Sequence, residues 1–458
     1  MKLIVLLTGL LSLLAFPAMA GEEIRPTLDL TVSWYGYLSI LIFVLAYLLV
    51  IFEEATEMRK SKPVMMAGGL IWALVGIAYM RAEQSDVAHA LALGVIEEYG
   101  ELFLFLLVAI TYVNTLEERR VFDALRARLT GLGLSYRKLF WLTGGLAFLL
   151  SGLLDNLTTA LVMGAVLMAI GRDNPKFLVL GCINVVVAAN AGGAFTPFGD
   201  ITTLMVWQKG KLSFFEFFVI FLPSLVNWLI PAVIMGFAVP AETPPITEDR
   251  ARMKPGARVV IGLFAATIIT AVSFKNFLHL PPALGMMLGL GYMQIFSYFI
   301  TRRGHRLEDH DLVLDSFKLF EKVEWDTLLF FFGIIFAVGG LGVLGYLSLA
   351  SSLLYDGMGP TIANTIIVAL SAIVDNIPLM FAVLTMDPVM SDGQWLLITL
   401  TCGVGGSMLS IGSAAGVALM GTARGAYTFG AHLKWSWAVA LGYFAAIGVH
   451  LVVNAHLF

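Results

Sequence analysis

The chain contains 458 residues, of which 59% are hydrophobic and only 13% are charged, and its formal net charge is −4. Soluble domains carry about 25% charged residues, so this composition excludes an ordinary water-soluble protein. Many apolar runs approach the roughly 20 residues that a helix needs to cross a bilayer. The runs are unbroken rather than alternating, which argues against a membrane β-barrel. We therefore predict an all-α polytopic membrane protein.

The first 20 residues form a segment of their own. A lysine at position 2, an apolar core and a terminal Ala18-Met19-Ala20 are typical of a secretory signal peptide. We expect cleavage after Ala20; the alternative is a retained first helix. In either case the chain from residue 21 onward starts outside the cytoplasm.

Apolar runs further along predict ten full crossings and two interrupted segments. The expected crossings are 34–52, 64–80, 101–117, 177–207, 214–238, 258–275, 281–300, 326–346, 395–423 and 435–456. Segments 139–171 and 361–387 each contain an Asp-Asn pair in the middle. We interpret both as re-entrant hairpins, because backbone that is not helical at membrane depth must be buried in protein or line a cavity.

The positions of the basic residues test this map. With the mature N-terminus outside, 22 Lys and Arg residues fall in or beside the cytoplasmic segments 53–63, 118–138, 172–176, 239–257, 301–325 and 424–434. Only five, namely Arg25, Arg81, Lys209, Lys211 and Lys275, fall outside. This asymmetry agrees with the positive-inside rule. If either hairpin were a simple crossing, the later loops would change sides and the asymmetry would be lost.

The two halves of the chain resemble each other in the same order. SGLLDNLTTALVM (151–163) resembles SAIVDNIPLMFAV (371–383), and GGAFTPFGD (192–200) resembles GGSMLSIGS (405–413). We predict an inverted-topology repeat of two five-helix units, each with a re-entrant hairpin and a broken helix. The units are 21–238 and 258–458, joined by a proline-rich cytoplasmic linker at 239–257. Secondary transporters are commonly built in this way, with the binding site where the repeats meet.

Both broken helices coincide with glycine-rich motifs. Residues 190–200, NAGGAFTPFGD, cannot form one continuous helix, because glycine weakens a helix and proline removes a donor and clashes with the preceding turn. The motifs 403–406 and 410–413 interrupt the ninth crossing less sharply. Breaks of this kind free backbone carbonyls that can coordinate a small cation.

Oxygen-bearing side chains cluster at the hairpin tips and at the breaks. The first half offers Asp155, Asn156, Asn190, Asp200, Thr202 and Thr203; the second offers Asp375 and the neutral Ser371, Asn376, Ser410 and Ser413. Hard cations prefer such all-oxygen shells, and acidic residues inside a membrane are expensive and rarely structural. We therefore predict that Na⁺ and H⁺ compete for mid-membrane carboxylates, with Asp155 and Asp200 as the first candidates. Asp375 is either functional or, beside Pro378, mainly architectural.

Two further groups of acids lie at helix ends. Glu98 and Glu101 are at the outer end of the third crossing, and Glu324 and Asp326 at the inner end of the eighth. They are either acidic entrances to an ion pathway or interfacial acids solvated at a helix end.

At these motifs the chain resembles the NhaD family of sodium/proton antiporters, from about residue 34 to the end. SGLLDNLTTALVM, NAGGAFTPFGDITTLMVW and EWDTLLFFFG carry the resemblance. It implies exchange of Na⁺ and Li⁺ for H⁺ across the bacterial inner membrane and a part in pH homeostasis. It also implies functional residues at positions that here are Glu101, Asp155, Asn156, Asn190, Asp200, Thr202, Thr203, Asp326, Ser371, Asn376, Ser410 and Ser413. A homodimer follows from the same resemblance.

The predicted function is secondary Na⁺/H⁺ exchange rather than an enzymatic reaction, with no cofactor beyond the transported ions. One alternative keeps the fold and changes the cargo, for example to arsenite. Another is an intramembrane aspartyl protease, although the Gly-x-Gly-Asp pattern is missing before Asp200. The sequence contains no phosphate-binding loop and no basic patch beyond the topology charges, so we expect lipid and small cations, not nucleic acid, as partners.

Overall fold

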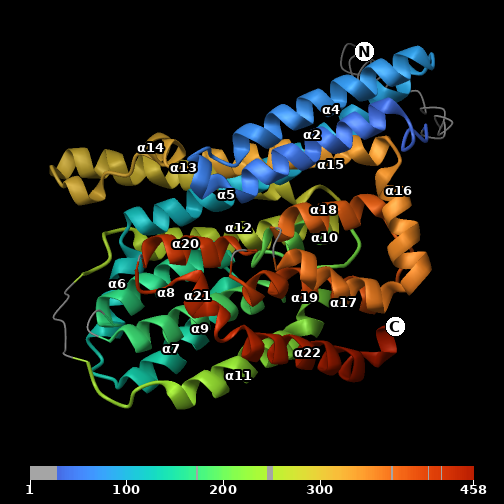
Figure 1. The fold of residues 1–458 in the computed structure, drawn as a ribbon. Helices are drawn as coiled ribbons and strands as arrows, with labels where there is room; N and C mark the ends of the chain where they lie inside the picture. Colours follow the sequence, from blue (N-terminus) through green and yellow to red (C-terminus); the bar gives the residue numbers. More distant parts are fainter. Residues whose placement is uncertain (1–27, 172–173, 245–250, 373–374, 411, 424) are drawn as a thin grey trace, which may run out of the picture.

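The computed structural model describes residues 28–171, 174–244, 251–372, 375–410, 412–423 and 425–458. The expected signal peptide at 1–20 lies outside the described residues. Within them the regular elements are helices (Figure 1). In chain order they are α2 (Trp34–Ile51), α3 (Glu53–Thr56), α4 (Ser61–Arg81), α5 (Ser85–Glu118), α6 (Val121–Thr130), α7 (Tyr136–Ser151), α8 (Asn156–Gly171), α9 (Pro175–Gly193), α10 (Ile201–Gln208), α11 (Phe221–Ala238), α12 (Ala257–Leu278), α13 (Pro282–Leu307), α14 (Ser316–Glu321), α15 (Trp325–Val343), α16 (Tyr346–Ser351), α17 (Pro360–Ser371), α18 (Asn376–Met386), α19 (Asp392–Gly405), α20 (Ala414–Thr422), α21 (Phe429–Leu433) and α22 (Ser436–Val453).

The all-helical membrane architecture is confirmed. Among the described residues, eight helices are long and apolar enough to cross a membrane. Eight of the ten predicted crossings contain one of them. The predicted crossing 395–423 is divided between α19 and α20, and the crossing 101–117 lies inside the much longer α5.

The two predicted interruptions at the Asp-Asn pairs are present. Helix α7 ends at Ser151 and α8 begins at Asn156, while α17 ends at Ser371 and α18 begins at Asn376. In each pair the aspartate comes directly before the second helix. The two helices of each pair pack against each other, as expected for a hairpin.

The helices pack in two groups that meet along α15, α18 and α10. In the first group α4 lies between α2 and α15, and α5 packs on α4, α12, α13 and α15. In the second group α9 packs on α7, α8 and α11, while α19 packs on α17 and α22. Figure 1 shows α2 and α4 crossing one side of the second group, with α16 running down the edge that joins the groups.

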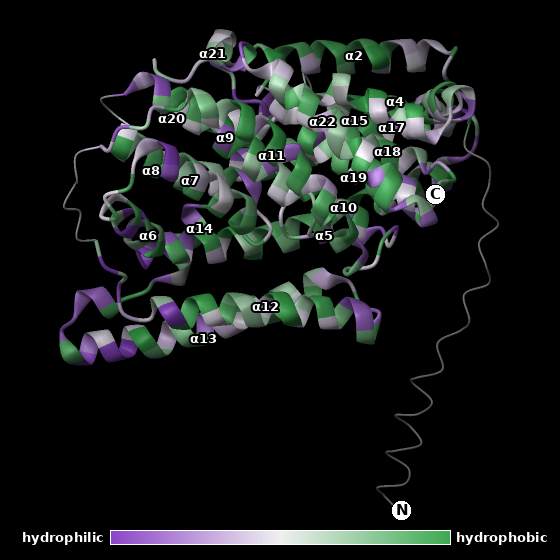
Figure 2. Ribbon diagram, turned by 90° about the horizontal axis from the view of Figure 1, so that it is seen from below, coloured by the Kyte–Doolittle hydropathy of each residue, from purple (hydrophilic) through white to green (hydrophobic). Residues whose placement is uncertain are grey.

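Helices α12 and α13 form a pair at one side of the molecule, where they pack on α5 (Figure 2). Their outward faces carry large apolar side chains, such as Phe277, which is 79% exposed, and Ile269, which is 66% exposed. A soluble protein rarely exposes a continuous apolar surface of this kind. These faces are therefore suited to contact with lipid tails.

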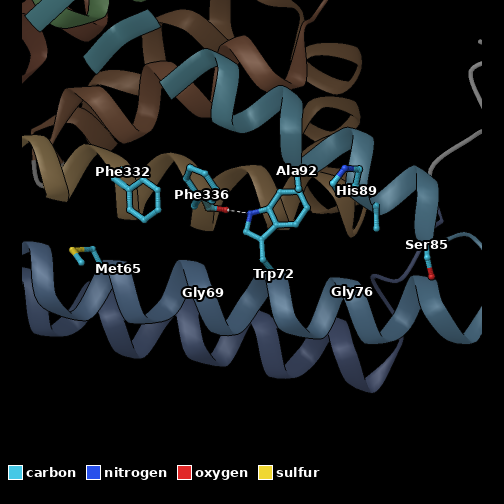
Figure 3. A pocket seen from close by; sticks show the side chains of 10 residues that line it. Met65, Gly69, Trp72, Gly76, Ser85, His89, Ala92, Phe332 and Phe336 are labelled. Carbon is cyan, nitrogen blue, oxygen red and sulfur yellow. Dashed lines mark hydrogen bonds between the residues drawn. The ribbon is translucent and has the colours of Figure 1, made fainter. Parts of the chain in front are cut away.

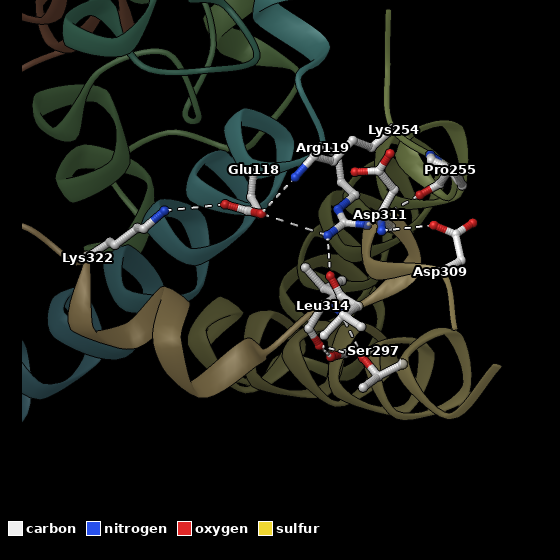
Figure 4. Close-up of polar contacts among 11 residues, drawn as sticks. Glu118, Arg119, Lys254, Pro255, Ser297, Asp309, Asp311, Leu314 and Lys322 are labelled. Atoms are coloured by element: carbon white, nitrogen blue, oxygen red, sulfur yellow. Dashed lines mark hydrogen bonds and ion pairs between the residues drawn. The ribbon is translucent and has the colours of Figure 1, made fainter. Parts of the chain in front are cut away.

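A buried arginine fixes the end of α5 to the segments around it (Figure 4). The Arg119 side chain is fully buried and donates to the carbonyl oxygens of Asp311, at 2.8 Å, and Val313, at 2.7 Å. Next to it, Glu118 accepts hydrogen bonds from Lys254 and Lys322. Burial raises the pKa of Glu118, but the hydrogen bonds and charges of the two lysines outweigh it, and the net pKa lies below its ordinary value. This network ties the linker between the halves to the region before α15.

A cavity of about 490 Å³ lies between α4, α5 and α15 (Figure 3). Its wall includes Trp72, whose indole nitrogen donates to the Phe336 carbonyl oxygen at 2.9 Å, together with Phe332 and His89. None of the predicted site residues lines this cavity.

Candidate functional site

Both predicted helix breaks are present in the structure. Helix α9 ends at Gly193 and α10 begins at Ile201, so the residues between them are not α-helical. Helix α19 ends at Gly405, a 3-10 turn covers Gly406–Met408, and α20 begins at Ala414. The glycines at the breaks are required by close backbone approach: a Cβ on Gly199 would lie 2.7 Å from the Ser151 carbonyl oxygen. The breaks therefore bring backbone and hairpin tips together in the protein interior.

Asp200 is at the centre of the first break. Its side chain is 4% exposed and caps α10, because Oδ1 accepts from the Thr202 amide at 2.9 Å and from the Thr202 hydroxyl at 3.0 Å. Its Oδ2 accepts from the side-chain amides of Asn156, at 2.8 Å, and Asn376, at 3.1 Å. The two hairpin tips, 220 residues apart, thus meet on one carboxylate oxygen.

Asn190 extends this cluster to the second break. Its Oδ1 accepts from Asn156 Nδ2 at 3.1 Å and from Ser413 Oγ at 3.0 Å. The Asn190 side chain is fully buried, and its Nδ2 has no hydrogen-bond partner among the residues that the structure describes. Buried polar atoms are nearly always paired, so an unpaired amide here marks a position where a further group can bind. We name Asp200, Asn190, Asn156, Asn376 and Ser413 the central cluster.

Five predicted site residues therefore meet, and the others lie around them. Asp155 is partly exposed, and its oxygens accept from the Thr158 amide, at 2.8 Å, and the Thr158 hydroxyl, at 2.7 Å. Thr203 donates to the carbonyl oxygens of Thr196 and Asp200. Ser371 donates to the Cys402 carbonyl oxygen at 2.9 Å. Within the described part of the chain, no hydrogen bond joins Asp155 to the central cluster, although the sequence put it first with Asp200.

Ser410 is engaged outside the central cluster. Its hydroxyl lies 2.7 Å from the hydroxyl of Tyr427, a residue that the sequence did not single out. No local pattern marks Tyr427, because its partner is 17 residues away across a helix.

The three predicted pathway acids fall in two places. Glu101 lines a cavity of about 350 Å³ with Glu98 and Lys209, which form an ion pair. Asp326 and Asp375 instead contact the start of α4: Ser61 donates to Asp326, and the Lys60 ammonium lies 3.8 Å from Asp375 Oδ2.

Lys60 is the second residue that the sequence missed. It was counted only as a cytoplasmic charge, yet it neutralises an aspartate at the tip of the second hairpin. Its position in a short polar segment before an apolar run gives no signal of this contact. The pairing depends on how α4 packs beside α15 and α18.

The central cluster combines one carboxylate with amides and a hydroxyl. Across the part of the chain that the structure describes, no three His, Cys, Asp or Glu side chains form a group able to hold a metal ion. Each asparagine side chain carries a carbonyl oxygen as well as an amide nitrogen, so rotation of the amide can exchange a donor for an acceptor. The arrangement can thus present either donors to a bare carboxylate or oxygens to a cation.

Comparison with known proteins identifies the family of this chain. The chain matches the profile of the family described as "Citrate transporter" over residues 47–403. It is 53% identical to a Na⁺/H⁺ antiporter NhaD of Alkalimonas amylolytica, covering 99% of this chain and 97% of that protein. It is 50% identical to the NhaD antiporter of Vibrio cholerae, over 99% of this chain and 100% of that protein. It is also 33% identical to sodium/proton antiporter 1 of Arabidopsis thaliana, over 90% of this chain and 72% of that protein. The chain therefore belongs to the citrate transporter family and, within it, to the group of the NhaD Na⁺/H⁺ antiporters.

Proposed function

We propose that this protein exchanges Na⁺, and also Li⁺, for H⁺ at the central cluster. The observation that carries the proposal is that the side-chain amides of both hairpin tips converge on the buried Asp200 carboxylate. A charged carboxylate inside a membrane protein is costly unless it is paired, protonated or bound to a cation. The two bacterial relatives described above are named Na⁺/H⁺ antiporters.

The exchange follows from competition for one group. Asn156 and Asn376 donate to Asp200 Oδ2 at 2.8 and 3.1 Å, an arrangement that suits an ionised carboxylate. A Na⁺ ion would replace these donors, and the two amides would turn their carbonyl oxygens toward it. A proton on Asp200 removes the charge that attracts the ion. Because one site holds either ion but not both, export of one is coupled to import of the other.

The fold that supports this is, in our proposal, an inverted repeat of residues 21–238 and 258–458. Matching contacts occur 213 residues apart in the two breaks. A Cβ on Gly193 would meet the Gly199 carbonyl oxygen at 2.6 Å, and one on Gly406 would meet the Gly412 carbonyl oxygen at 2.5 Å. Ser151 donates to the Ala189 carbonyl oxygen, and Ser371 donates to that of Cys402. Two halves with such shared contacts can exchange conformations symmetrically.

Orientation and assembly complete the proposal. We place the mature N-terminus in the periplasm and the linker 239–257 in the cytoplasm of a bacterial inner membrane, in line with the basic residues. In Figure 1 the described parts of the linker, 239–244 and 251–256, lie at the opposite end of the helices from the C-terminus, which supports this orientation. We further propose a homodimer.

Everted membrane vesicles acidified inside by respiration provide the test. Addition of NaCl or LiCl between pH 7 and 9 should dissipate the pH gradient, followed with an acridine dye, and choline chloride should not. Asp200→Asn should abolish the response, while Asp392→Asn, at an exposed position outside the central cluster, should keep it. If vesicles that contain the unmodified protein show no response to Na⁺ or Li⁺ over this range, the proposal is wrong.

A further inference from the structure

A chain of hydrogen bonds joins the second break to the short helix α21. The Ser410 hydroxyl lies 2.7 Å from the Tyr427 hydroxyl, which lies 2.8 Å from His432 Nδ1. On its other side, His432 Nε2 lies 2.8 Å from the Ser407 carbonyl oxygen. The three side chains are 0%, 1% and 0% exposed, respectively. The chain therefore starts and ends in the break between α19 and α20.

The direction of these hydrogen bonds follows from the Ser407 carbonyl, which can only accept. Nε2 of His432 must donate to it, and a neutral imidazole has only one N–H. Burial lowers the pKa of His432 to about 4, and the carbonyls of Ser407 and Met408 oppose this only in part, so the ring is neutral near pH 7. Nδ1 is then an acceptor, and it receives the Tyr427 proton. The Tyr427 oxygen in turn accepts from Ser410.

Because the Ser410 hydroxyl proton points to Tyr427, the lone pairs of the Ser410 oxygen point away from Tyr427. A hydroxyl whose proton is already committed can still accept or bind a cation, but cannot donate elsewhere. This is the state in which a serine favours a positive ion over another donor.

Ser410 also has an unusual backbone conformation. Its φ is +68°, in the left-handed region that residues with a Cβ rarely adopt. Helix α20 touches it closely, since a Cβ on Gly416 would lie 2.2 Å from both the carbonyl and hydroxyl oxygens of Ser410. Only three residues later, Ser413 donates to Asn190 of the central cluster. Ser410 therefore lies within three residues of a member of that cluster.

We propose that Tyr427 and His432 are positioning residues, which hold the second break in place and fix the Ser410 hydroxyl as an acceptor for a cation. This inference rests on the proposed function and assigns to it two residues beyond the predicted site. The hydrogen bonds of Tyr427 and His432 described above do not reach the central cluster directly. They act through the two residues of the break that they contact, Ser410 through Tyr427 and Ser407 through His432.

The test compares two buried tyrosines. Tyr427→Phe removes a hydroxyl that accepts from Ser410 and donates to His432. Tyr112→Phe removes a hydroxyl that accepts from Thr267 and donates to the Gly289 carbonyl, at 2.9 and 2.7 Å, in the packing of α5 with α12 and α13. We expect the half-maximal Na⁺ concentration for exchange to rise about 5- to 10-fold in Tyr427→Phe, with the maximal rate within about twofold of wild type. Tyr112→Phe should leave the half-maximal concentration unchanged.

Two further variants separate positioning from mere stability. His432→Asn keeps an oxygen that can accept from Tyr427, so this variant should largely retain the wild-type Na⁺ dependence. His432→Leu removes the acceptor and should behave like Tyr427→Phe. In a Ser410→Ala background, Tyr427→Phe should add nothing, because the two residues act as one unit. An unchanged half-maximal Na⁺ concentration in Tyr427→Phe, an equal rise in Tyr112→Phe, or additive effects with Ser410→Ala would each overturn the inference.

A binding measurement distinguishes failure of this inference from failure of the proposed function. If the unmodified protein does not exchange Na⁺, the proposed function fails. Thermal unfolding of the detergent-purified full chain with and without NaCl then decides the inference. Stabilisation by Na⁺ that keeps the wild-type concentration dependence in Tyr112→Phe and requires about 5- to 10-fold more NaCl in Tyr427→Phe supports it. Absence of stabilisation in the unmodified protein, or equal stabilisation in both variants, overturns it.

Discussion

Two variants of Asp155 can separate the effect of its charge on transport from the effect of its hydrogen bonds on stability. Its side chain caps the first turn of α8 by accepting from the Thr158 amide and hydroxyl, at 2.8 and 2.7 Å. Asparagine keeps an acceptor oxygen and caps a helix about as well as aspartate. Asp155→Asn therefore removes the charge while the cap remains, and Asp155→Ala removes both.

The expected magnitudes differ between the two roles. Loss of a cap costs about 1 kcal/mol, and loss of the second hydrogen bond about 0.5–1.5 kcal/mol, so Asp155→Ala should lower the free energy of unfolding by about 1–3 kcal/mol. Asp155→Asn should lower it by only a few tenths of a kcal/mol. A carboxylate about 4 Å from a cation contributes about 4 kcal/mol at an effective dielectric constant of 20. If Asp155 carries the ion, both variants should therefore weaken the apparent Na⁺ affinity by at least about 100-fold.

The assay is Na⁺-dependent dissipation of the pH gradient in everted vesicles, together with thermal unfolding of each purified variant. The decisive variant is Asp155→Asn. Exchange by Asp155→Asn at the wild-type rate and Na⁺ dependence, with lower stability in Asp155→Ala only, would refute a transport role for Asp155. The residue would then be a helix cap, and the ion would depend on Asp200 alone.

Further variants test the packing at the first break and at the end of α5. Gly199→Ala should prevent folding or insertion, because its Cβ would lie 2.6 Å from a backbone Cα across the break. The control Gly76→Ala should be tolerated, because its Cβ would meet nothing within 4 Å. Membrane abundance and melting temperature measure the effect of both variants. Arg119→Met should lower stability by about 3 kcal/mol or more, because two buried carbonyls lose a charged donor; a melting temperature equal to wild type would contradict this. The lowered pKa of Glu118 predicts that its ion pairs stabilise the protein fully above its ordinary value of 4.5 and are lost as the pH falls through the lower folded-state pKa. Glu118→Gln should thus make the melting temperature less sensitive to acidification, and an unchanged acid dependence would argue against it.

Several features could be predicted from local sequence because local forces decide them. Runs of about 20 apolar residues predict membrane helices whatever their neighbours. The glycines and Pro197 of residues 190–200 predict the first break, since they oppose a helix in any context. Asp155 and Asp375 at the hairpin tips were also recognisable, because an acid within an apolar run is rarely accidental.

The ranking of the two leading aspartates could not be predicted in the same way. Asp155 and Asp200 have similar neighbours in sequence, because a threonine follows two or three residues after each of them, at Thr158 and Thr202. Only packing separates them: Asp200 receives amides from both hairpin tips, while Asp155 is satisfied within its own helix turn. Asn376 reaches Asp200 across 176 residues, and no local pattern contains that information.

The sequence by itself determined where most of the helices lie, where they break and which acids interrupt apolar segments, because helix formation and its interruption depend on neighbouring residues. Only the tertiary structure decided which oxygens share one site, that Lys60 neutralises Asp375, and that Tyr427 and His432 hold Ser410. Those contacts join side chains on different elements. Their distances depend on how whole helices pack, which a one-dimensional pattern does not specify.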